Sequence, residues 1–457
     1  PARDIALIAL VALGARLAYL ALVYSGDASL MVPDSGLYLA LAAESHAWMA
    51  SAGHAGDWQS DPTRLPLYPL FLAAVRLFVG SPDPLYPVLA QIVIDSLACL
   101  MVARLGASFG GRTGLIAGLA AALNPTQIVF SALILTDSLF LFFATAMLAA
   151  SCRWLERPKP GAALAIGLAG GGALLTRAVL WPWLALLALL LAALLALAGR
   201  WRETGWRRFL AQAALGAAAV VLVISPVIER NLRQHGTLSL SAQSGWHALY
   251  WIVPLAREAG DGTPWARSVA ELEIKFAART PGLAELGPFA LNRAQLAFAA
   301  AELAALGPVA IAGAWAYGAA INLAAPAVIQ SPPVAALPRT GFYATPGDSK
   351  LDKIVTFMFR NDHPVYARIL LAGIVLEVLL RLGQGLGLAR AWGRREGRGR
   401  EGRARLALLL AWIGFVLAVS GPVASAKYRL PAEPALAVLL ALGLGRMGGV
   451  GRMDPRT

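Results

Sequence analysis

The sequence is poor in the charged residues that a soluble protein needs on its surface. Asp, Glu, Lys and Arg make up only 14% of its 457 residues, whereas 58% are hydrophobic, and the mean hydropathy is +0.63. A soluble fold cannot cover that much apolar surface, so a soluble globular protein is excluded. A lipid bilayer must therefore solvate most of the chain.

Cysteine and histidine are also scarce. The two cysteines, Cys99 and Cys152, lie inside or at the end of apolar runs, and the five histidines lack metal-ligand spacing. The cysteines give neither a disulfide framework nor a zinc pattern. His46 and His54 are expected to be solvated.

Acidic residues are outnumbered by basic ones, which gives a net charge of +13. Such a charge could indicate a nucleic-acid partner. Here, however, the arginines lie in short junctions between apolar runs, as is typical of cytoplasmic loops of membrane proteins. Nucleic acid is therefore not expected as a partner, whereas membrane lipids are.

Apolar runs recur along the chain, and a helix needs about 17–25 such residues to cross a bilayer. The first run lacks a cleavage site and is interpreted as a retained span. Asn124-Pro125 should break the helix between the third and fourth runs. These patterns predict an all-α polytopic membrane protein, with one domain over 1–447. Its ten predicted transmembrane helices are 5–24, 85–105, 113–125, 134–151, 161–178, 179–198, 209–228, 366–388, 404–423 and 431–447.

The basic residues orient these spans. They occupy alternate junctions, which all fall on one side if there are ten crossings, and that side should be cytoplasmic. Segment 25–84 is then the first periplasmic loop, 229–365 a large periplasmic or re-entrant segment, and 448–457 a cytoplasmic tail. The orienting residues are Arg104, Arg112, Arg153, Arg157, Lys159, Arg200, Arg202, Arg207, Arg208, Arg390, Arg394, Arg395, Arg398, Arg400, Arg403, Arg405, Arg446, Arg452 and Arg456.

Residues 307–329 are apolar enough to span, but one crossing there would place the Arg390–Arg405 run outside. We therefore expect 291–329 to be interfacial, re-entrant or a hairpin, with a break at Gly307-Pro308.

Some polar and small residues inside the spans are predicted to be structural. Arg16 and Asp95 should reach the same depth in antiparallel spans and pair, because an unpaired charge there is costly. Glu377 and Arg381 are four residues apart, a spacing that permits pairing. Glycines between 167 and 172 should allow close helix packing and not form a phosphate loop.

The first outer loop is acidic: it contains Asp27, Asp34, Glu44, Asp57, Asp61 and Asp83. Asp34 precedes a predicted interfacial helix over 37–52. A carboxylate at a membrane surface beside apolar walls suits a general base. Asp34 could equally cap the helix that follows.

Six short motifs lie on this outer face. They are Asp34-x-x-x-Tyr38, Arg64-x-Pro-x-Tyr68-Pro69, Thr136-Asp137, Leu175-Thr176-Arg177, Pro226-x-x-x-Arg230-Asn231-x-x-x-x-Gly236 and Lys427-Tyr428-Arg429-Leu430-Pro431. In this order they resemble the bacterial protein O-mannosyltransferase-like glycosyltransferases of the GT-C fold, which are related to lipid A aminoarabinose transferases. The resemblance covers essentially the whole chain and is weakest over 255–365.

This resemblance implies an inverting glycosyltransferase at the periplasmic face of a bacterial inner membrane. The donor would be a polyprenyl-monophosphate-linked sugar, and the acceptor a lipid, glycan or protein. Asp34 matches the proposed base. Asp137 matches a second-loop acid that can help hold a divalent cation, Mg²⁺ or Mn²⁺, although a helix N-terminus also favours an anion. No other cofactor is implied.

Cations at the outer ends of spans suit the donor, because transfer leaves a lipid phosphate. We predict that Arg177, Arg230, Lys427 and Arg429 bind this phosphate; snorkelling to lipid headgroups is the alternative. Further residues could line the cavity or touch the acceptor, although a packing role is open for the tyrosines. They are Tyr38, Arg64, Tyr68, Asn231, Trp246 and His247.

Two other functions suit many spans and buried charges. A transporter or flippase often shows two related halves, which this sequence lacks. A polysaccharide polymerase or ligase of the cell envelope shares the topology, but the Asp34-x-x-x-Tyr38 motif argues against it.

Overall fold

The computed structural model describes residues 2–54, 58–110, 112–338, 345–360, 363–393 and 399–445. Within these ranges the regular structure is helical and contains no strand, as predicted. Some residues and segments predicted above lie outside the described residues: Asp57, Arg394, Arg395, Arg398, Arg446, Arg452, Arg456 and the tail 448–457.

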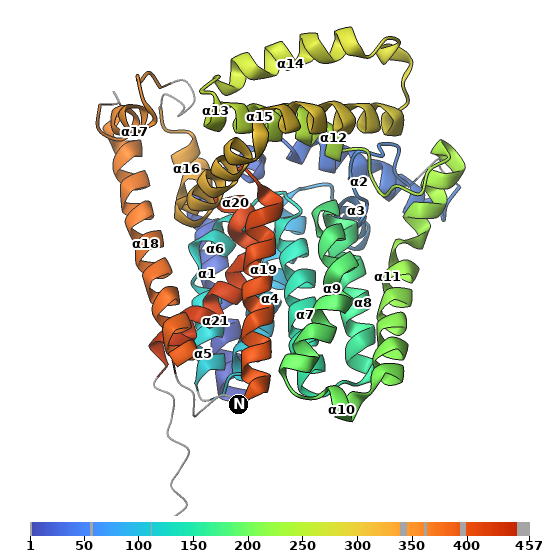
Figure 1. Ribbon diagram of the computed structural model, residues 1–457, viewed down its shortest axis with the longest axis vertical. Coiled ribbons are helices and arrows are strands. Elements are labelled where there is room, and N and C mark those ends of the chain that lie inside the picture. The colour runs from blue at the N-terminus through green and yellow to red at the C-terminus, as the bar shows by residue number, and fades with distance from the viewer. Residues whose placement is uncertain are drawn as a thin grey trace, which may run out of the picture.

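A bundle of helices forms the body of the molecule (Figure 1). It contains α1 (Ala2–Val23), α4 (Leu85–Ala107), α5 (Thr113–Ala122), α6 (Pro125–Ser131), α7 (Asp137–Glu156), α8 (Pro160–Thr176), α9 (Trp181–Leu197), α11 (Trp206–His235), α18 (Pro364–Gly393), α19 (Arg400–Ser420) and α21 (Glu433–Leu444).

Shorter or tilted helices cover one end of this bundle, at the top of Figure 1. They are α2 (Ser35–Ala50), α3 (Leu67–Val79), α12 (Ser244–His247), α13 (Val253–Gly260), α14 (Trp265–Arg279), α15 (Pro288–Ala324), α16 (Pro332–Ala335), α17 (Lys350–Phe359) and α20 (Ala426–Arg429). The N-terminal end of α1 and α10 (Trp201–Thr204) lie at the opposite end (Figure 1).

Seven described helices are long and apolar enough to cross a membrane, or eight if α5 and α6 are one bent span. The seven are Ala2–Val23, Leu85–Ala107, Asp137–Glu156, Ala178–Leu197, Trp206–His235, Pro288–Ala324 and Arg400–Ser420. Helices α8, α18 and α21, which occupy predicted spans, also lie in the bundle (Figure 1). The count of ten crossings stays a prediction.

The predicted break at Asn124-Pro125 is confirmed. Helix α5 ends at Ala122, α6 starts at Pro125, and the two differ in direction by 47°. Asn124 accepts hydrogen bonds from the backbone N–H groups of Thr126 and Gln127, so it caps α6 while Pro125 takes the first helical position, where its missing N–H has no cost.

The predicted pairing of Arg16 with Asp95 is also confirmed. The two side chains are buried, with 2.5 Å between Arg16 Nη2 and Asp95 Oδ2. Arg16 Nη1 also donates to the carbonyl of Ala122 at the end of α5. The pair therefore neutralises both charges and fixes the start of the bend into α6.

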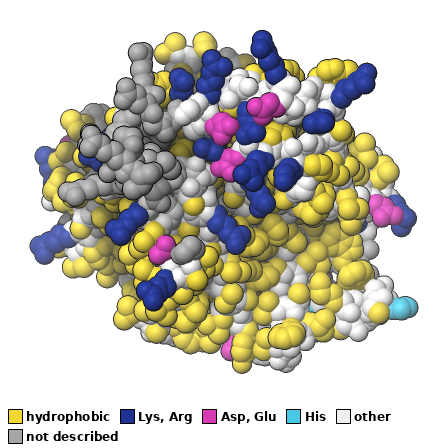
Figure 2. All heavy atoms as spheres, turned by 90° about the horizontal axis from the view of Figure 1, so that it is seen from below, with side chains coloured by type: hydrophobic (Ala, Val, Ile, Leu, Met, Phe, Trp, Pro, Cys, Tyr) yellow, Lys and Arg dark blue, Asp and Glu magenta, His cyan; other side chains and the backbone are white. Residues whose placement is uncertain are grey.

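The basic junctions meet at the end of the bundle that carries α10. Arg200 lies 3.1 Å from Glu401, and Arg405 lies 2.7 Å from Glu156, so three junctions that are distant in the sequence are joined there. Figure 2 shows this end, where Lys and Arg side chains outnumber acidic ones. The structure thus gathers these cations at one end, as the alternating pattern predicted.

Helix α15 breaks at Gly307, as expected, where φ is 79°. Its first half packs on α14, where the rings of Phe276 and Phe298 lie 5.3 Å apart. Its second half packs on the end of α19, where the indole of Trp315 donates to the Ala418 carbonyl. Figure 1 shows α15 lying across the end of the bundle. That this segment is interfacial, re-entrant or a hairpin in the membrane stays a prediction.

Candidate functional site

Five charged side chains from four segments of the chain gather at the covered end of the bundle. Asp34 and Arg64 come from the loop after α1, Asp137 starts α7, Arg177 follows α8, and Lys427 lies in α20. We call these five residues the charge cluster.

Asp34 occupies the N-cap position of α2, but its side chain makes no capping hydrogen bond. Its carboxylate instead faces two cations: Oδ1 lies 3.4 Å from Arg64 Nη2, and Oδ2 lies 3.7 Å from Lys427 Nζ. The Asp34 side chain is 45% exposed. The structure therefore does not show the side-chain cap, and the base role of Asp34 stays a prediction.

Asp137 is the first residue of α7, and its side chain is 0% exposed. Its Oδ1 lies 3.0 Å from Arg177 Nη2, and Arg177 Nε donates to Thr136 Oγ1. The guanidinium also lies 5.5 Å from the ring centroid of Phe140. The helix N-terminus and Arg177 together stabilise this buried anion. Both explanations of Asp137 that the sequence left open, an anion at a helix start and a site acid, fit this position.

Lys427 links the two carboxylates. Burial of its ammonium lowers the pKa of Lys427, and Asp137, Arg177, Asp34 and Arg64 all act electrostatically on it. The structure thus brings Lys427, one of the predicted phosphate-binding residues, into the charge cluster.

Two predicted tyrosines form the wall of the cluster. The rings of Tyr38 and Tyr68 meet edge to face with centroids 5.1 Å apart, and Tyr68 donates to Gln91 Oε1 at 2.5 Å. Burial raises the pKa of Tyr38, while the charges of Arg64 and Arg177 act to lower it. Tyr38 therefore borders the charge cluster, whereas Tyr68 packs against Tyr38.

Two further residues, Tyr428 and His247, lie near the charge cluster. Burial raises the pKa of Tyr428, on which Arg177, Asp137 and Asp34 also act. Burial lowers the pKa of His247, and the charge of Lys427 lowers it further. His247 was predicted to touch the acceptor, whereas Tyr428 was quoted within the last motif without a role of its own.

Arg429 does not take the phosphate-binding role predicted for it. Its guanidinium is 0% exposed and pairs with Glu377 and Glu433, each at 2.5 Å. A buried cation that is already neutralised by two carboxylates cannot also receive a phosphate. This prediction is wrong.

Arg230 and Asn231 also have structural contacts. Arg230 donates to Asn231 Oδ1 and to the Gln59 carbonyl, and its guanidinium lies 4.9 Å from the ring centroid of Trp58. Asn231 donates to the carbonyls of Ser239 and Leu240. These bonds tie α11 to the first loop and to the chain beyond α11, so neither side chain joins the charge cluster in its described contacts.

Trp246 is exposed and its ring lies 5.5 Å from that of Tyr250. The contacts described for it do not reach the cluster. Among the residues that the structure describes, no three His, Cys, Asp or Glu side chains gather as a metal site. The divalent-cation role of Asp137 stays a prediction.

Residues 61–229 match the family of dolichyl-phosphate-mannose-protein mannosyltransferases. The match contains Arg64, Tyr68, Asp137 and Arg177 of the site. The matched segment makes up less than half of the 457 residues, so the similarity concerns one part of the chain. Asp34 and Lys427 lie outside this segment, and the structure rather than the family match joins them to the rest of the site.

The fold is similar to the archaeal oligosaccharyltransferase AglB from Archaeoglobus fulgidus, solved in complex with an inhibitory peptide and a dolichol-phosphate. The identity is 14% and the TM-score 0.51, over 96% of this chain and 49% of that chain. The oligosaccharyltransferase of the same organism in its apo form has 16% identity and a TM-score of 0.49, over 96% and 50% of the two chains. This chain thus spans about half the length of both. No curated protein matches it.

Proposed function

We propose that this protein is a glycosyltransferase, which moves a sugar from a polyprenyl-monophosphate carrier to an acceptor hydroxyl with inversion at the anomeric carbon. The observation that supports this most is the charge cluster, in which Arg64 and Lys427 face the accessible carboxylate of Asp34 and Arg177 pairs with the buried carboxylate of Asp137. The match of residues 61–229 to a lipid-phosphate-sugar transferase family favours this function over transport.

In the proposed reaction the Asp34 carboxylate takes the proton of the acceptor hydroxyl as its oxygen attacks the anomeric carbon. The bond between that carbon and the phosphate oxygen breaks, and the phosphate leaves with the electron pair. Arg177 and Lys427 stabilise the negative charge that develops there, and the planar fork of Arg177 can hold two phosphate oxygens.

Asp137 has a different role in this proposal. Because it is buried and paired with Arg177, it is poorly placed to receive an acceptor proton. It holds the Arg177 guanidinium instead, while Arg64 orients Asp34 from the other side. Preorganised charges of this kind need no rearrangement during the reaction.

The proposed location of the site follows from the charges at the two ends of the bundle. The charge cluster lies at the end opposite the basic junctions, and cationic junctions favour the cytoplasmic side. We therefore propose a periplasmic site in a bacterial inner membrane. The acceptor is proposed to be a lipid, a glycan or a protein, and membrane lipids surround the bundle.

The test of this function is Asp34→Asn, which keeps the shape of the side chain and removes the base. We expect the turnover number to fall by about 10²–10⁴-fold while donor affinity changes little. The measurement is sugar release from synthetic polyprenyl-phosphate donors by the purified protein.

Asp61→Asn is the matched control, because Asp61 lies in the same loop and accepts hydrogen bonds from Thr63. It should retain transfer. Transfer at the wild-type rate by the Asp34 variant would remove the base assignment.

A further inference from the structure

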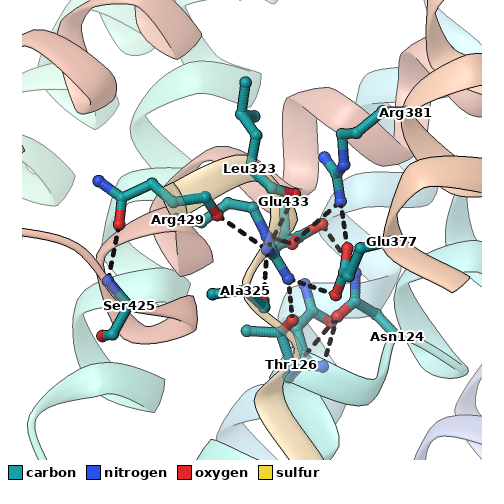
Figure 3. Close-up of polar contacts among 11 residues, drawn as sticks. Asn124, Thr126, Leu323, Ala325, Glu377, Arg381, Ser425, Arg429 and Glu433 are labelled. Carbon is teal, nitrogen blue, oxygen red and sulfur yellow. Dashed lines mark hydrogen bonds and ion pairs between the residues drawn. The ribbon is translucent and has the colours of Figure 1, made fainter. Parts of the chain in front are cut away.

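A buried ion network surrounds Arg429, which lies two residues after Lys427 in the sequence. Arg429 pairs with Glu377 of α18 and Glu433 of α21. Arg381 adds a contact of 2.8 Å to Glu377 and one of 3.7 Å to Glu433. Figure 3 shows these four side chains converging from α18, α20 and α21. Two cations and two carboxylates thus neutralise each other away from water.

Arg429 also closes the C-terminal end of α15. Its Nη1 lies 2.8 Å from the carbonyls of both Asn322 and Ala325, which have no helical partner further on. Its Nη2 donates to Thr126 Oγ1 in α6 at 2.9 Å. One guanidinium therefore joins four helices to the short α20 segment (Figure 3).

The chain just before Lys427 is held by α15 as well. The backbone N–H of Ser425 donates to Asn322 Oδ1, and Asn322 Nδ2 donates to the Val423 carbonyl. Gly318 of α15 approaches so closely that an added Cβ would lie 2.2 Å from the Gly421 carbonyl. Lys427 is thus fixed on both sides in the sequence.

We propose that Arg429, Glu377 and Glu433 are positioning residues that hold Lys427 between Asp34 and Asp137. This rests on the proposed function, in which Lys427 meets the departing phosphate. Helix α20 has only four residues and cannot fix the position of a side chain by itself. The ion network supplies the support, because its charges are buried and each has a partner on another element.

The experiment uses Glu377→Gln, which preserves size and removes one buried charge. Arg429 and Arg381 would then share Glu433 alone, and the buried network would carry one uncompensated positive charge. Relaxation of this charge would displace α20, and a displacement of about 1 Å can cost about 10²-fold in rate. We expect the turnover number to fall by about tenfold or more, and Lys427 to react faster with an amine-acylating reagent, as measured by mass spectrometry. Wild-type turnover and wild-type Lys427 reactivity would overturn the proposal.

Asp95→Asn is the stability-matched control. It also breaks a fully buried carboxylate–arginine pair, but the contacts of Arg16 do not include α20. It should lower the melting temperature about as much as Glu377→Gln does, and leave the reactivity of Lys427 unchanged. If Glu377→Gln does not fold, Thr126→Val removes one bond to Arg429 and tests the same point in a milder form.

Lys427→Met separates this inference from the proposed function. Unimpaired transfer by Lys427→Met contradicts the phosphate role of Lys427, whereas the labelling comparison still reports whether Glu377 positions the lysine, since labelling needs no donor. Lost transfer by Lys427→Met together with wild-type behaviour of Glu377→Gln overturns the positioning role alone.

Discussion

Lys427 and Arg429 lie two residues apart in one motif and have opposite environments. Lys427 faces the charge cluster, where Asp34 Oδ2 is 3.7 Å away, while Arg429 is enclosed by two carboxylates. The ammonium of Lys427 is sensitive to its surroundings, because burial lowers the pKa of Lys427 below that of an ordinary lysine.

This lowered pKa predicts a pH effect for Lys427→Arg. Lys427 loses its charge at a lower pH than an ordinary lysine, so the rate should fall on the alkaline side as its ammonium deprotonates. An arginine stays charged throughout. The alkaline limb of the kcat/KM profile should therefore move to higher pH in the variant, even if its peak is lower. Coincident alkaline limbs would contradict this.

Sequence identified residues near helix ends better than it distinguished between the cations. Asp34, Arg64, Asp137 and Arg177 lie at or near the ends of helices, Tyr38 lies near the start of α2, and these positions bring them together. Whether Arg429 or Lys427 faces the cluster depends on where Glu377 and the end of α15 pack, over 50 residues and over 100 residues away in the chain. A local motif carries no information about such distant partners.

At the scale of elements, α8 carries Arg177 at one end and a row of glycines along its length. An added Cβ on Gly167 would lie 2.2 Å from the Gly216 carbonyl of α11, and one on Gly171 would lie 2.8 Å from Val223. The close packing predicted from these glycines is confirmed. It sets the position of α8, and therefore the position from which Arg177 reaches Asp137.

Gly167→Ala is expected to destabilise the protein by about 1–3 kcal/mol, because a backbone carbonyl cannot yield to the new methyl group as a side chain can. Gly161→Ala on the same helix is the control, since nothing lies within 4 Å of its added Cβ. Thermal melting in detergent should show a lower melting temperature for the first variant and no loss for the second. Equal melting temperatures would refute the close-packing explanation.

At the scale of the whole molecule, the basic junctions and the charge cluster occupy opposite ends of the bundle. Composition and the alternation of arginines predicted this separation, because an unpaired charge is costly in the apolar layer. The sequence did not reveal the path of α15, since its apolar composition fits both a span and a helix lying across the end.

The orientation can be measured with single cysteines. Cys99 and Cys152 are buried, so they should give little background. Leu238→Cys, after the outer end of α11, should react with a membrane-impermeant maleimide on intact cells. Arg202→Cys, in α10, should react only after permeabilisation. The reverse pattern would place the charge cluster in the cytoplasm.

The composition of the charge cluster has a consequence for the electrical balance of the proposed reaction. Three cations and two carboxylates leave one positive charge, which the single negative charge of a sugar-linked phosphodiester offsets. When Asp34 takes the acceptor proton, the protein groups carry two positive charges, just as the released phosphate monoester comes to carry two negative ones. Reactant and product states are then both neutral, so sugar transfer proceeds without creating an uncompensated charge beside the membrane.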